Sequence, residues 1–262
     1  MREKLAVLVL AAGGAGCLCL ILALPVKREV VLAGYATSLR GRTGAQRFNA
    51  EKAARTVNGT VIAPGAVFSF NRTVRSWTWD RGYMKAPVSY DGEMIPAYGG
   101  GVCQTATTLY NAALLAGMLI LERHPHVFAT HYAPPGRDAA VAQYHVDLRF
   151  QNPYPFPVRI ETGLEGDLLL IRLVGERRPE QQVEVISEVV SRTAPKRLTR
   201  THAGGYADSK AFLRQPGAMG CRVITYRVFS RHGREVRRER LSDDLYQPMD
   251  RIVSWPEARP AQ

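Results

Sequence analysis

Cys103 follows three glycines in the run Gly99-Gly100-Gly101-Val102-Cys103-Gln104, and this arrangement could activate its thiol. Apolar residues at helical spacing predict a helix over roughly 103–120, so the cysteine lies at or near the N-terminus of that helix. Free backbone N–H groups and the helix dipole favour an anion there, which would lower the pKa of the thiol. The glycines allow backbone angles that other residues avoid and leave room beside the sulfur. Cys103 is therefore the candidate nucleophile.

A thiol nucleophile needs a base, and usually a second group that orients the base. His126 and Asp138 lie downstream of the predicted helix, and we predict that they are the base and its orienter. A cysteine at a helix start, followed by a histidine and an aspartate from a downstream sheet, is the order found in transglutaminase-like thiol enzymes. Weaker candidates for the same two roles are His124, His131, His145 and Asp147.

Each of these residues also has a structural interpretation. Cys103 could be a small buried residue in a tight glycine turn, or it could form a disulfide with Cys221 in an oxidising compartment. His126 could order the loop after the helix through hydrogen bonds, and Asp138 could form a turn. His124 and His126 give the only short spacing near Cys103 that suits a metal, so we predict no metal and no cofactor.

Other small or polar residues near the thiol could contact a substrate. The predicted substrate-binding residues are Gly100, Gly101, Gln104, Thr107, Tyr110 and Arg123. The irregular segment before the glycine run is rich in aromatic residues, which could line a sugar-binding groove, although core packing explains them equally well. These residues are Trp77, Trp79, Tyr83 and Tyr90.

Several short motifs resemble the signature blocks of the VanW family, in the right order along the chain. They are Pro64-Gly65-Ala66-Val67-Phe68-Ser69-Phe70-Asn71, the run Gly99 to Gln104, Thr107-Thr108-Leu109-Tyr110-Asn111-Ala112, Glu122-Arg123 with His126, Gly136-Arg137-Asp138-Ala139-Ala140-Val141, and Asp147-Leu148-Arg149-Phe150-Gln151-Asn152. The resemblance implies a vancomycin-resistance-associated protein of the cell envelope. Family members are often anchored in the membrane and often carry a wall-associated module named G-five, to which residues 180–255 are similar in part.

Two positions depart from the family pattern. Members usually have serine where this chain has Ala106, and commonly have serine after the histidine, where this chain has Val127. Neither change removes Cys103, His126 or Asp138. The resemblance therefore supports no role for a hydroxyl group at those two places.

The N-terminus has the features of a membrane anchor. Arg2 and Lys4 precede an uncharged apolar run from Leu5 to Pro25, and about 20 apolar residues suffice to span a bilayer core as a helix. We predict a single-pass anchor over residues 1–26, with the bulk of the chain extracytoplasmic. The alternatives are a cleaved signal peptide and a lipoprotein signal at Cys17.

The chain is strongly basic, with 35 lysines and arginines against 23 acidic residues and a formal net charge of +12. The excess is spread along the chain, and no nucleic-acid-binding module is recognisable, so we expect no nucleic-acid partner. Peptidoglycan or another anionic wall polymer suits this charge. The membrane would be contacted through the N-terminal helix.

The predicted fold class is α+β: a mixed helix/antiparallel-sheet domain after an N-terminal transmembrane helix, with a small β-rich C-terminal unit. The predicted parts are the anchor over 1–26, a stalk and first strand over 27–48, a VanW-like domain over 49–175 and the C-terminal unit, with its G-five likeness, over 176–262. Predicted elements span 50–58 (a helix capped by Asn49), 67–70, 103–120, 128–132, 141–150, 158–162 and 168–174, and a hairpin turn falls at 231–234.

Residues and resemblance together predict a membrane-anchored envelope protein of the VanW type that acts on or binds peptidoglycan. If Cys103 is catalytic, the expected reaction is acyl transfer or amide hydrolysis on peptidoglycan peptides. The alternative is a non-catalytic module that binds peptidoglycan or glycopeptide, or that has a structural role in the envelope. Catalysis requires the sulfur to lie near a histidine ring in open surroundings, whereas a structural thiol is sealed in the core.

Overall fold

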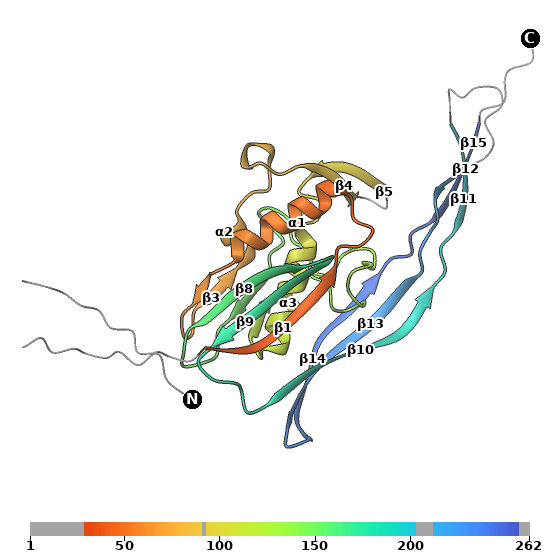
Figure 1. Ribbon diagram of the computed structural model, residues 1–262. Coiled ribbons are helices and arrows are strands. Elements are labelled where there is room, and N and C mark those ends of the chain that lie inside the picture. The colour runs from red at the N-terminus through yellow and green to blue at the C-terminus, as the bar shows by residue number, and fades with distance from the viewer. Residues whose placement is uncertain (1–28, 91–92, 203–211, 257–262) are drawn as a thin grey trace, which may run out of the picture.

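The computed structural model describes residues 29–90, 93–202 and 212–256, and antiparallel strands dominate it (Figure 1). Strands make up 48% of the structure and helices 17%. The predicted α+β class, a mixture of helix and sheet, is therefore wrong. The reason is that the helices before residue 180 are short, and that long strands without a helix form the described part of the chain after it.

A four-stranded antiparallel sheet lies at the centre of the N-terminal unit. Its strands, in order across the sheet, are β1 (Val30–Ser38), β9 (Leu168–Gly175), β8 (Val158–Glu165) and β2 (Val61–Ile62). Leu169, Ile171 and Leu173 alternate along β9 and are fully buried, which is the pattern of a strand with one face on the core. The apolar runs over 158–162 and 168–174 predict the pair of β8 and β9, and this prediction is confirmed.

Helix α3 (Val102–Leu115) packs on this sheet, and helix α1 (Gly44–Val57) packs beside it (Figure 1). Almost all side chains of α3 are buried, so this helix forms the centre of the core. A helix is predicted here and is confirmed, but the predicted end at residue 120 is wrong. Gly117 has a φ of 73°, a left-handed conformation that ends helices, and the chain continues into β6 (Leu119–Glu122).

Helix α1 begins earlier than the sequence predicts. Thr43 caps it: the Thr43 hydroxyl accepts a hydrogen bond from Gln46 N (3.2 Å), and Gln46 Oε1 accepts one from Thr43 N (3.2 Å). The predicted cap, Asn49, is wrong, because this residue lies inside the helix. Its side-chain amide donates to the carbonyls of Met84 and Gly100 (both 2.9 Å). Asn49 thereby ties α1 to the glycine run.

Smaller elements surround these helices. One sheet contains β3 (Val67–Ser69), β7 (Arg149–Gln151) and β6, another contains β4 (Lys85–Tyr90) and β5 (Glu93–Tyr98), and short helices are α2 (Phe70–Val74) and η1 (Trp79–Arg81). The strand predicted over 67–70 is confirmed as β3. The strand predicted over 128–132 is wrong, because no strand in the described part of the chain pairs with it. Of 141–150 only the end is a strand, and Ala142 and Val146 form an isolated bridge.

The C-terminal unit consists of long β-ribbons. One sheet contains β10 (Gln182–Thr193), β13 (Gly220–Arg231) and β14 (Arg234–Tyr246), and another contains β11 (Arg197–His202), β15 (Arg251–Pro256) and β12 (Phe212–Gln215). The hairpin turn predicted at 231–234 is confirmed between β13 and β14. His232 and Gly233 have φ values of 51° and 74°, and both are positive, as a tight two-residue hairpin turn requires.

The two units share a core beside α3, where the long strands of the C-terminal unit run along the N-terminal unit (Figure 1). Val185 of β10 and Leu241 of β14 pack with the same apolar cluster as α3. Arg227 of β13 is buried, donates to the Met118 carbonyl oxygen (2.6 Å) and pairs with Glu239 (2.5 Å). Residues that are far apart in the sequence therefore meet at this interface.

The predicted anchor over residues 1–26 lies outside the described residues. Within residues 29–90, 93–202 and 212–256, none of the helices has the length and the apolar character that crossing a membrane would require.

Candidate functional site

The glycine run before Cys103 is packed tightly against the rest of the protein. Gly99 and Gly101 have φ values of 84° and 111°, which residues with a side chain rarely adopt. A β-carbon on Gly99 would lie 2.1 Å from the Trp77 ring, and one on Gly101 would lie 2.2 Å from the Gln46 carbonyl oxygen. The run therefore fixes the start of α3, and protein atoms fill the space that was predicted to be open.

Cys103 is the second residue of α3, is half-buried and packs against the main apolar core. When protonated, its Sγ donates to the Val141 carbonyl oxygen (3.4 Å), and the thiol also forms a hydrogen bond with His126. The N–H groups of its neighbours Val102 and Gln104 donate to glycine carbonyls of the preceding turn. Among the described residues, no backbone carbonyl accepts from the Cys103 N–H, which leaves a donor beside the sulfur.

His126 lies in the irregular segment after β6, and Asp138 holds it in place. Asp138 Oδ2 accepts hydrogen bonds from His126 N (2.7 Å) and from the ring Nδ1 (2.5 Å). Because Nδ1 is bound to the carboxylate, Nε2 is the ring nitrogen available to the sulfur and to the Tyr132 hydroxyl at 3.5 Å. The side chain of His126 is 23% exposed and that of Asp138 is 1% exposed. The three predicted catalytic residues therefore lie together.

The second carboxylate oxygen of Asp138 is held by two groups for which no such role was predicted. Oδ1 accepts from Arg123 Nη2 (2.9 Å) and from the Tyr246 hydroxyl (2.5 Å). Arg123 also pairs through Nη1 with Asp244 Oδ2 (2.5 Å). Tyr246 and Asp244 both belong to β14. The C-terminal unit therefore supplies part of the network behind the imidazole ring.

The charges of these groups shift one another's pKa values. Burial alone would lower the pKa of His126, but its hydrogen bonds to Asp138 and Cys103 raise it to about 9. Burial would raise the pKa of Cys103, yet the hydrogen bond and charge of His126 hold it below its usual value. Burial would also raise the pKa of Asp138. The hydrogen bond and charge of His126, together with the charge of Arg123, outweigh burial and lower the pKa of this carboxyl. The arrangement stabilises the thiolate, imidazolium and carboxylate forms of the three side chains.

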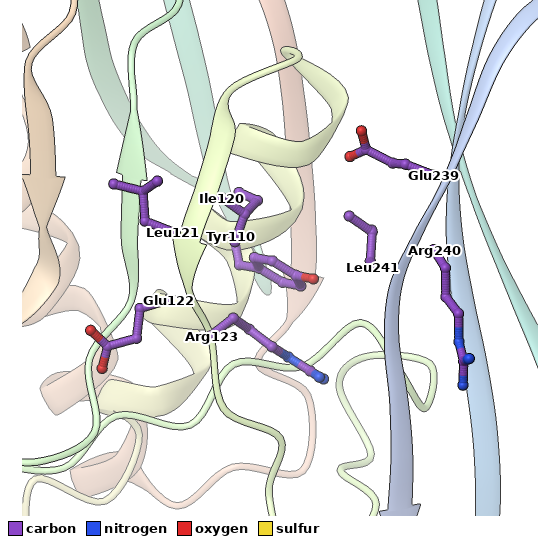
Figure 2. Close-up of a pocket in the computed structure, with 8 residues that line it drawn as sticks. All are labelled: Tyr110, Ile120, Leu121, Glu122, Arg123, Glu239, Arg240 and Leu241. Carbon is purple, nitrogen blue, oxygen red and sulfur yellow. The ribbon is translucent and has the colours of Figure 1, made fainter.

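A cavity of about 300 Å³ lies where the two units meet, between α3 and β6 on one side and β14 on the other (Figure 2). Tyr110 and Arg123 face Glu239 and Leu241 across it. The guanidinium of Arg123 is 5.6 Å from the ring centre of Tyr110, and burial raises the pKa of Tyr110 to about 12. Cys103 does not line this cavity, so the cavity marks the interface and not the thiol.

Tyr132 lies near the thiol and Arg42 lies beside Tyr132, and neither residue was predicted to do so. The Arg42 guanidinium lies 4.8 Å from the Tyr132 ring centre, and its Nε donates to Gln104 Oε1 (3.1 Å). Burial, with the charge of Cys103, raises the pKa of Tyr132 well above its usual value. Its hydroxyl is therefore a neutral hydrogen-bond donor near His126 Nε2. No local sequence motif marks either residue.

Most predicted substrate-binding residues have partners inside the protein. Gln104 is 2% exposed, and its amide donates to Thr37 Oγ1 (3.1 Å) and to the Ser38 carbonyl oxygen (2.9 Å). Thr107 is fully buried, and its hydroxyl accepts from Ala139 N (2.9 Å). These two side chains support α3 and the segment that carries the predicted orienter. The others, which pack against α1 and β4 or at the interface between the units, are Gly100, Gly101, Tyr110 and Arg123.

The weaker candidates for base and orienter have other surroundings. His124 bonds to Glu122 (3.1 Å), and His131 is exposed. Asp147 accepts from Ser69 Oγ (2.5 Å) and braces the start of α2. The disulfide alternative is wrong, because the two cysteines in the described part of the chain, Cys103 and Cys221, are both free thiols. Within that part no group of three histidine, cysteine or acidic side chains is placed to hold a metal ion.

A family model described as VanW like protein matches residues 45–174. The chain belongs to the VanW family. The matched VanW region includes the glycine run and all three predicted catalytic residues, Cys103, His126 and Asp138. Tyr246 and Asp244 lie beyond it, so the VanW region receives two side chains of its site network from the C-terminal unit.

Two curated relatives are similar to this VanW family chain over part of their length. Protein YoaR of Bacillus subtilis is 34% identical over 161 residues, which cover 62% of this chain and 53% of the relative. Vancomycin B-type resistance protein VanW of Enterococcus faecalis is 29% identical over 138 residues, which cover 51% of this chain and 50% of the relative. The chain therefore spans about half the length of these relatives.

One solved structure, the G5 domain of an IgA1 protease, is similar to a smaller part. It shows 22% identity, covers 31% of this chain and 96% of that domain, and has a TM-score of 0.20. A TM-score this low carries no argument about the fold.

Proposed function

We propose that this VanW family protein acts in the cell envelope, on peptidoglycan peptides, by a thiol acyl-transfer or amide-hydrolysis mechanism. One observation carries the proposal: a hydrogen-bonded series runs from Cys103 through His126 to the carboxylate of Asp138. A thiol that only packs has no need of an imidazole oriented by a buried carboxylate, whereas a nucleophilic thiol requires both.

The reaction begins with Cys103 as thiolate and His126 as imidazolium. Sγ attacks the carbonyl carbon of an amide, an S–C bond forms, and the π electron pair of the carbonyl moves to its oxygen. The free Cys103 N–H and the dipole of α3 stabilise this oxyanion. When the electron pair returns, the C–N bond breaks and His126 Nε2 gives its proton to the leaving amine. A thioester and a neutral imidazole remain.

The second half of the reaction regenerates the thiolate. Water or an amine attacks the thioester carbon, and His126 Nε2 takes the proton of the attacking group. The S–C bond then breaks, and its electron pair returns to Cys103. Water gives a carboxylic acid, and an amine gives a new amide. Asp138 keeps its bond to Nδ1 throughout, so Nε2 stays directed towards the sulfur.

Peptidoglycan as the target rests on family membership and on charge. One relative is named as a vancomycin B-type resistance protein. The chain carries a formal net charge of +12, which suits an anionic wall polymer. The apolar run within residues 1–26 would anchor it as a single-pass protein, with the bulk of the chain outside the membrane. In that place the thiol would meet wall peptides and not cytoplasmic substrates.

Peptide release from isolated peptidoglycan tests the proposal. The full chain and its Cys221→Ala variant should release peptides or form new cross-links, whereas Cys103→Ala should do neither. Because Cys221 is a free, buried cysteine, its variant controls for the loss of a thiol as such. If the wild-type chain forms no product, and Cys103 is alkylated no faster than Cys221, the catalytic proposal is refuted. A non-catalytic peptidoglycan-binding module would then be the better account.

A further inference from the structure

A second cavity, of about 650 Å³, opens beside β3 and α2. On its other side lies the loop of residues 142–146, which the Ala142–Val146 bridge closes. We name this cavity the α2 groove. Its lining includes Ser69, Asn71, Arg72, Arg75, Tyr144 and Arg149. It shares only Glu122 with the interface cavity in Figure 2, which lies against β14.

The α2 groove contains two cations without an acidic partner. Across the described residues, no carboxylate lies within the 4.0 Å of an ion pair from the guanidinium of Arg72 or Arg75. The acidic side chains in the lining are already engaged. Asp147 accepts hydrogen bonds from one hydroxyl and two backbone N–H groups, and Glu122 pairs with Arg149 (3.5 Å). An anionic group that enters the groove would therefore meet unpaired positive charge.

Two unusual backbone positions frame the α2 groove. Arg75 and Tyr144 have φ values of 65° and 75°, a region that costs a residue with a side chain about 1 kcal/mol or more. Glycine would adopt both conformations without this cost. Asn71 keeps the loop in place, because its side-chain amide donates to the carbonyls of Ala142 and Val146 (both 3.0 Å). The chain thus holds a guanidinium and an aromatic ring at positions where glycine would be favoured.

Tyr144 presents its ring at the rim of the α2 groove and is 88% exposed. An aromatic face of this kind packs on the apolar face of a sugar ring, and its hydroxyl remains free to form hydrogen bonds. A guanidinium binds a carboxylate through two parallel N–H groups, which gives both affinity and orientation. Tyr144 beside Arg72 and Arg75 therefore combines the two chemistries that recognise a sugar bearing a carboxylate.

The α2 groove is close to Cys103 along the chain. Val141, whose carbonyl oxygen accepts from the Cys103 thiol, directly precedes the loop that carries Tyr144. Three residues span at most about 10 Å when fully extended. The loop that carries Tyr144 is therefore close to the sulfur in space, within the length of one extended substrate.

We propose that the α2 groove is a subsite for the glycan part of the substrate, and that it binds sugar units carrying carboxylate groups. Tyr144 packs on a sugar ring, and Arg72 and Arg75 bind the carboxylates. The choice of a wall glycan rests on the proposed function, but binding in the groove does not require thiol chemistry. The subsite would place a peptide that is attached to a neighbouring sugar unit of the same glycan at Cys103.

Binding of soluble glycan strands with free sugar carboxylates, prepared by removing the stem peptides from peptidoglycan, to the full chain tests this assignment. Arg72→Ala/Arg75→Ala and, separately, Tyr144→Ala should each weaken binding at least about tenfold. The matched control is Arg178→Ala/Arg234→Ala, which removes the same charge from two exposed arginines outside the groove. This control variant should change the affinity for the strands less than about twofold, because salt screens the long-range attraction of exposed charges. Strands whose carboxylates are capped as amides should bind wild type as weakly as uncapped strands bind the groove variant.

Three results would overturn the assignment. One is equal weakening by the groove variant and by the control variant, because net charge would then explain binding. Another is tighter binding of a phosphate-bearing wall polymer than of the carboxylate-bearing strand. The third is wild-type affinity in both groove variants. Cys103→Ala separates this assignment from the proposed reaction: it should bind strands like wild type, and a wild-type chain that binds but forms no product refutes only the reaction.

Discussion

Replacing Asp138 by asparagine keeps the size of the side chain but removes its charge, and the structure predicts the consequence for Cys103. The carboxylate accepts four hydrogen bonds, two from His126 and one each from Arg123 and Tyr246. An amide offers one acceptor oxygen and places an NH₂ group among donors. We therefore expect Asp138→Asn to abolish most of the shift that raises the pKa of His126 to about 9.

The size of the effect follows from that shift. A return of the His126 pKa to its usual value of about 6.5 is a change of about 2.5 units, or at most about 3–4 kcal/mol. At pH 7 the protonated fraction of His126 would fall from nearly all to about one quarter. The imidazolium is what lowers the pKa of Cys103, so the thiolate fraction falls as well. The charge of Asp138 itself raises the pKa of Cys103, so its loss offsets part of this change, and we expect alkylation of Cys103 at pH 7 to slow by up to about fourfold.

Iodoacetamide labelling, followed by mass spectrometry of the Cys103 peptide across a range of pH, measures this rate. Asp147→Asn is the matched control. Asp147 also accepts three hydrogen bonds within the protein, but it is not one of the residues that hold the His126 ring. It should leave the labelling rate and its pH midpoint unchanged. The reasoning would be refuted if Asp138→Asn were labelled at the wild-type rate, or if Asp147→Asn slowed labelling as much as Asp138→Asn does.

Two further predictions concern stability. Tyr246→Phe should lower the free energy of unfolding by about 2–4 kcal/mol, because Asp138 loses a hydrogen-bond donor and the buried Gly136 N–H loses its acceptor. Denaturant unfolding measures this difference, with Tyr226→Phe as the control. An equal loss of stability in both variants would contradict the prediction. Since the pKa of His126 is raised on folding, its contribution to stability is fully present below about pH 6.5 and is lost as the pH rises through about 9. Unfolding midpoints from about pH 6 to about pH 10 should therefore fall more steeply for wild type than for His126→Gln, and parallel curves would argue against the shift.

Local signals predict much of the fold. The hairpin turn at 231–234 follows from a glycine after His232, and the pair β8 and β9 follows from apolar runs separated by turn residues. The start of α1 was missed although the sequence contains its signal, a threonine followed three residues later by Gln46. The strand predicted over 128–132 shows the limit of such signals, because an extended segment becomes a strand only where a partner lies beside it.

The fold class was wrong for a related reason. Side chains along β10 and β14 are largely exposed, so these long strands carry only weak alternation in the sequence. Their stability comes from pairing with β13, which is buried on one face and lies between them. Pairing between distant segments leaves little trace in any one of them.

The candidate site divides in the same way. Cys103, His126 and Asp138 belong to short motifs, and their residue types alone indicate their chemistry. Tyr246 and Asp244 could not be predicted, because 108 residues separate Tyr246 from Asp138 and 121 separate Asp244 from Arg123. The sequence correctly indicates that the glycine run lies beside the site, but it does not show what the missing side chains make room for. The space beside Gly99 and Gly101 is filled by Trp77 and Gln46, not by a ligand.

The bond between Tyr246 and Asp138 also has a consequence in time. A ribosome makes the chain from its N-terminus, so Cys103 and His126 are synthesised well before β14. Until that strand docks, Asp138 lacks one of its four donors, and Arg123 lacks its bond to Asp244. The thiol therefore gains its full electrostatic setting at the end of folding. A nascent chain, or one truncated before β14, carries the same cysteine with a less firmly held base, which delays its reactivity until β14 has docked.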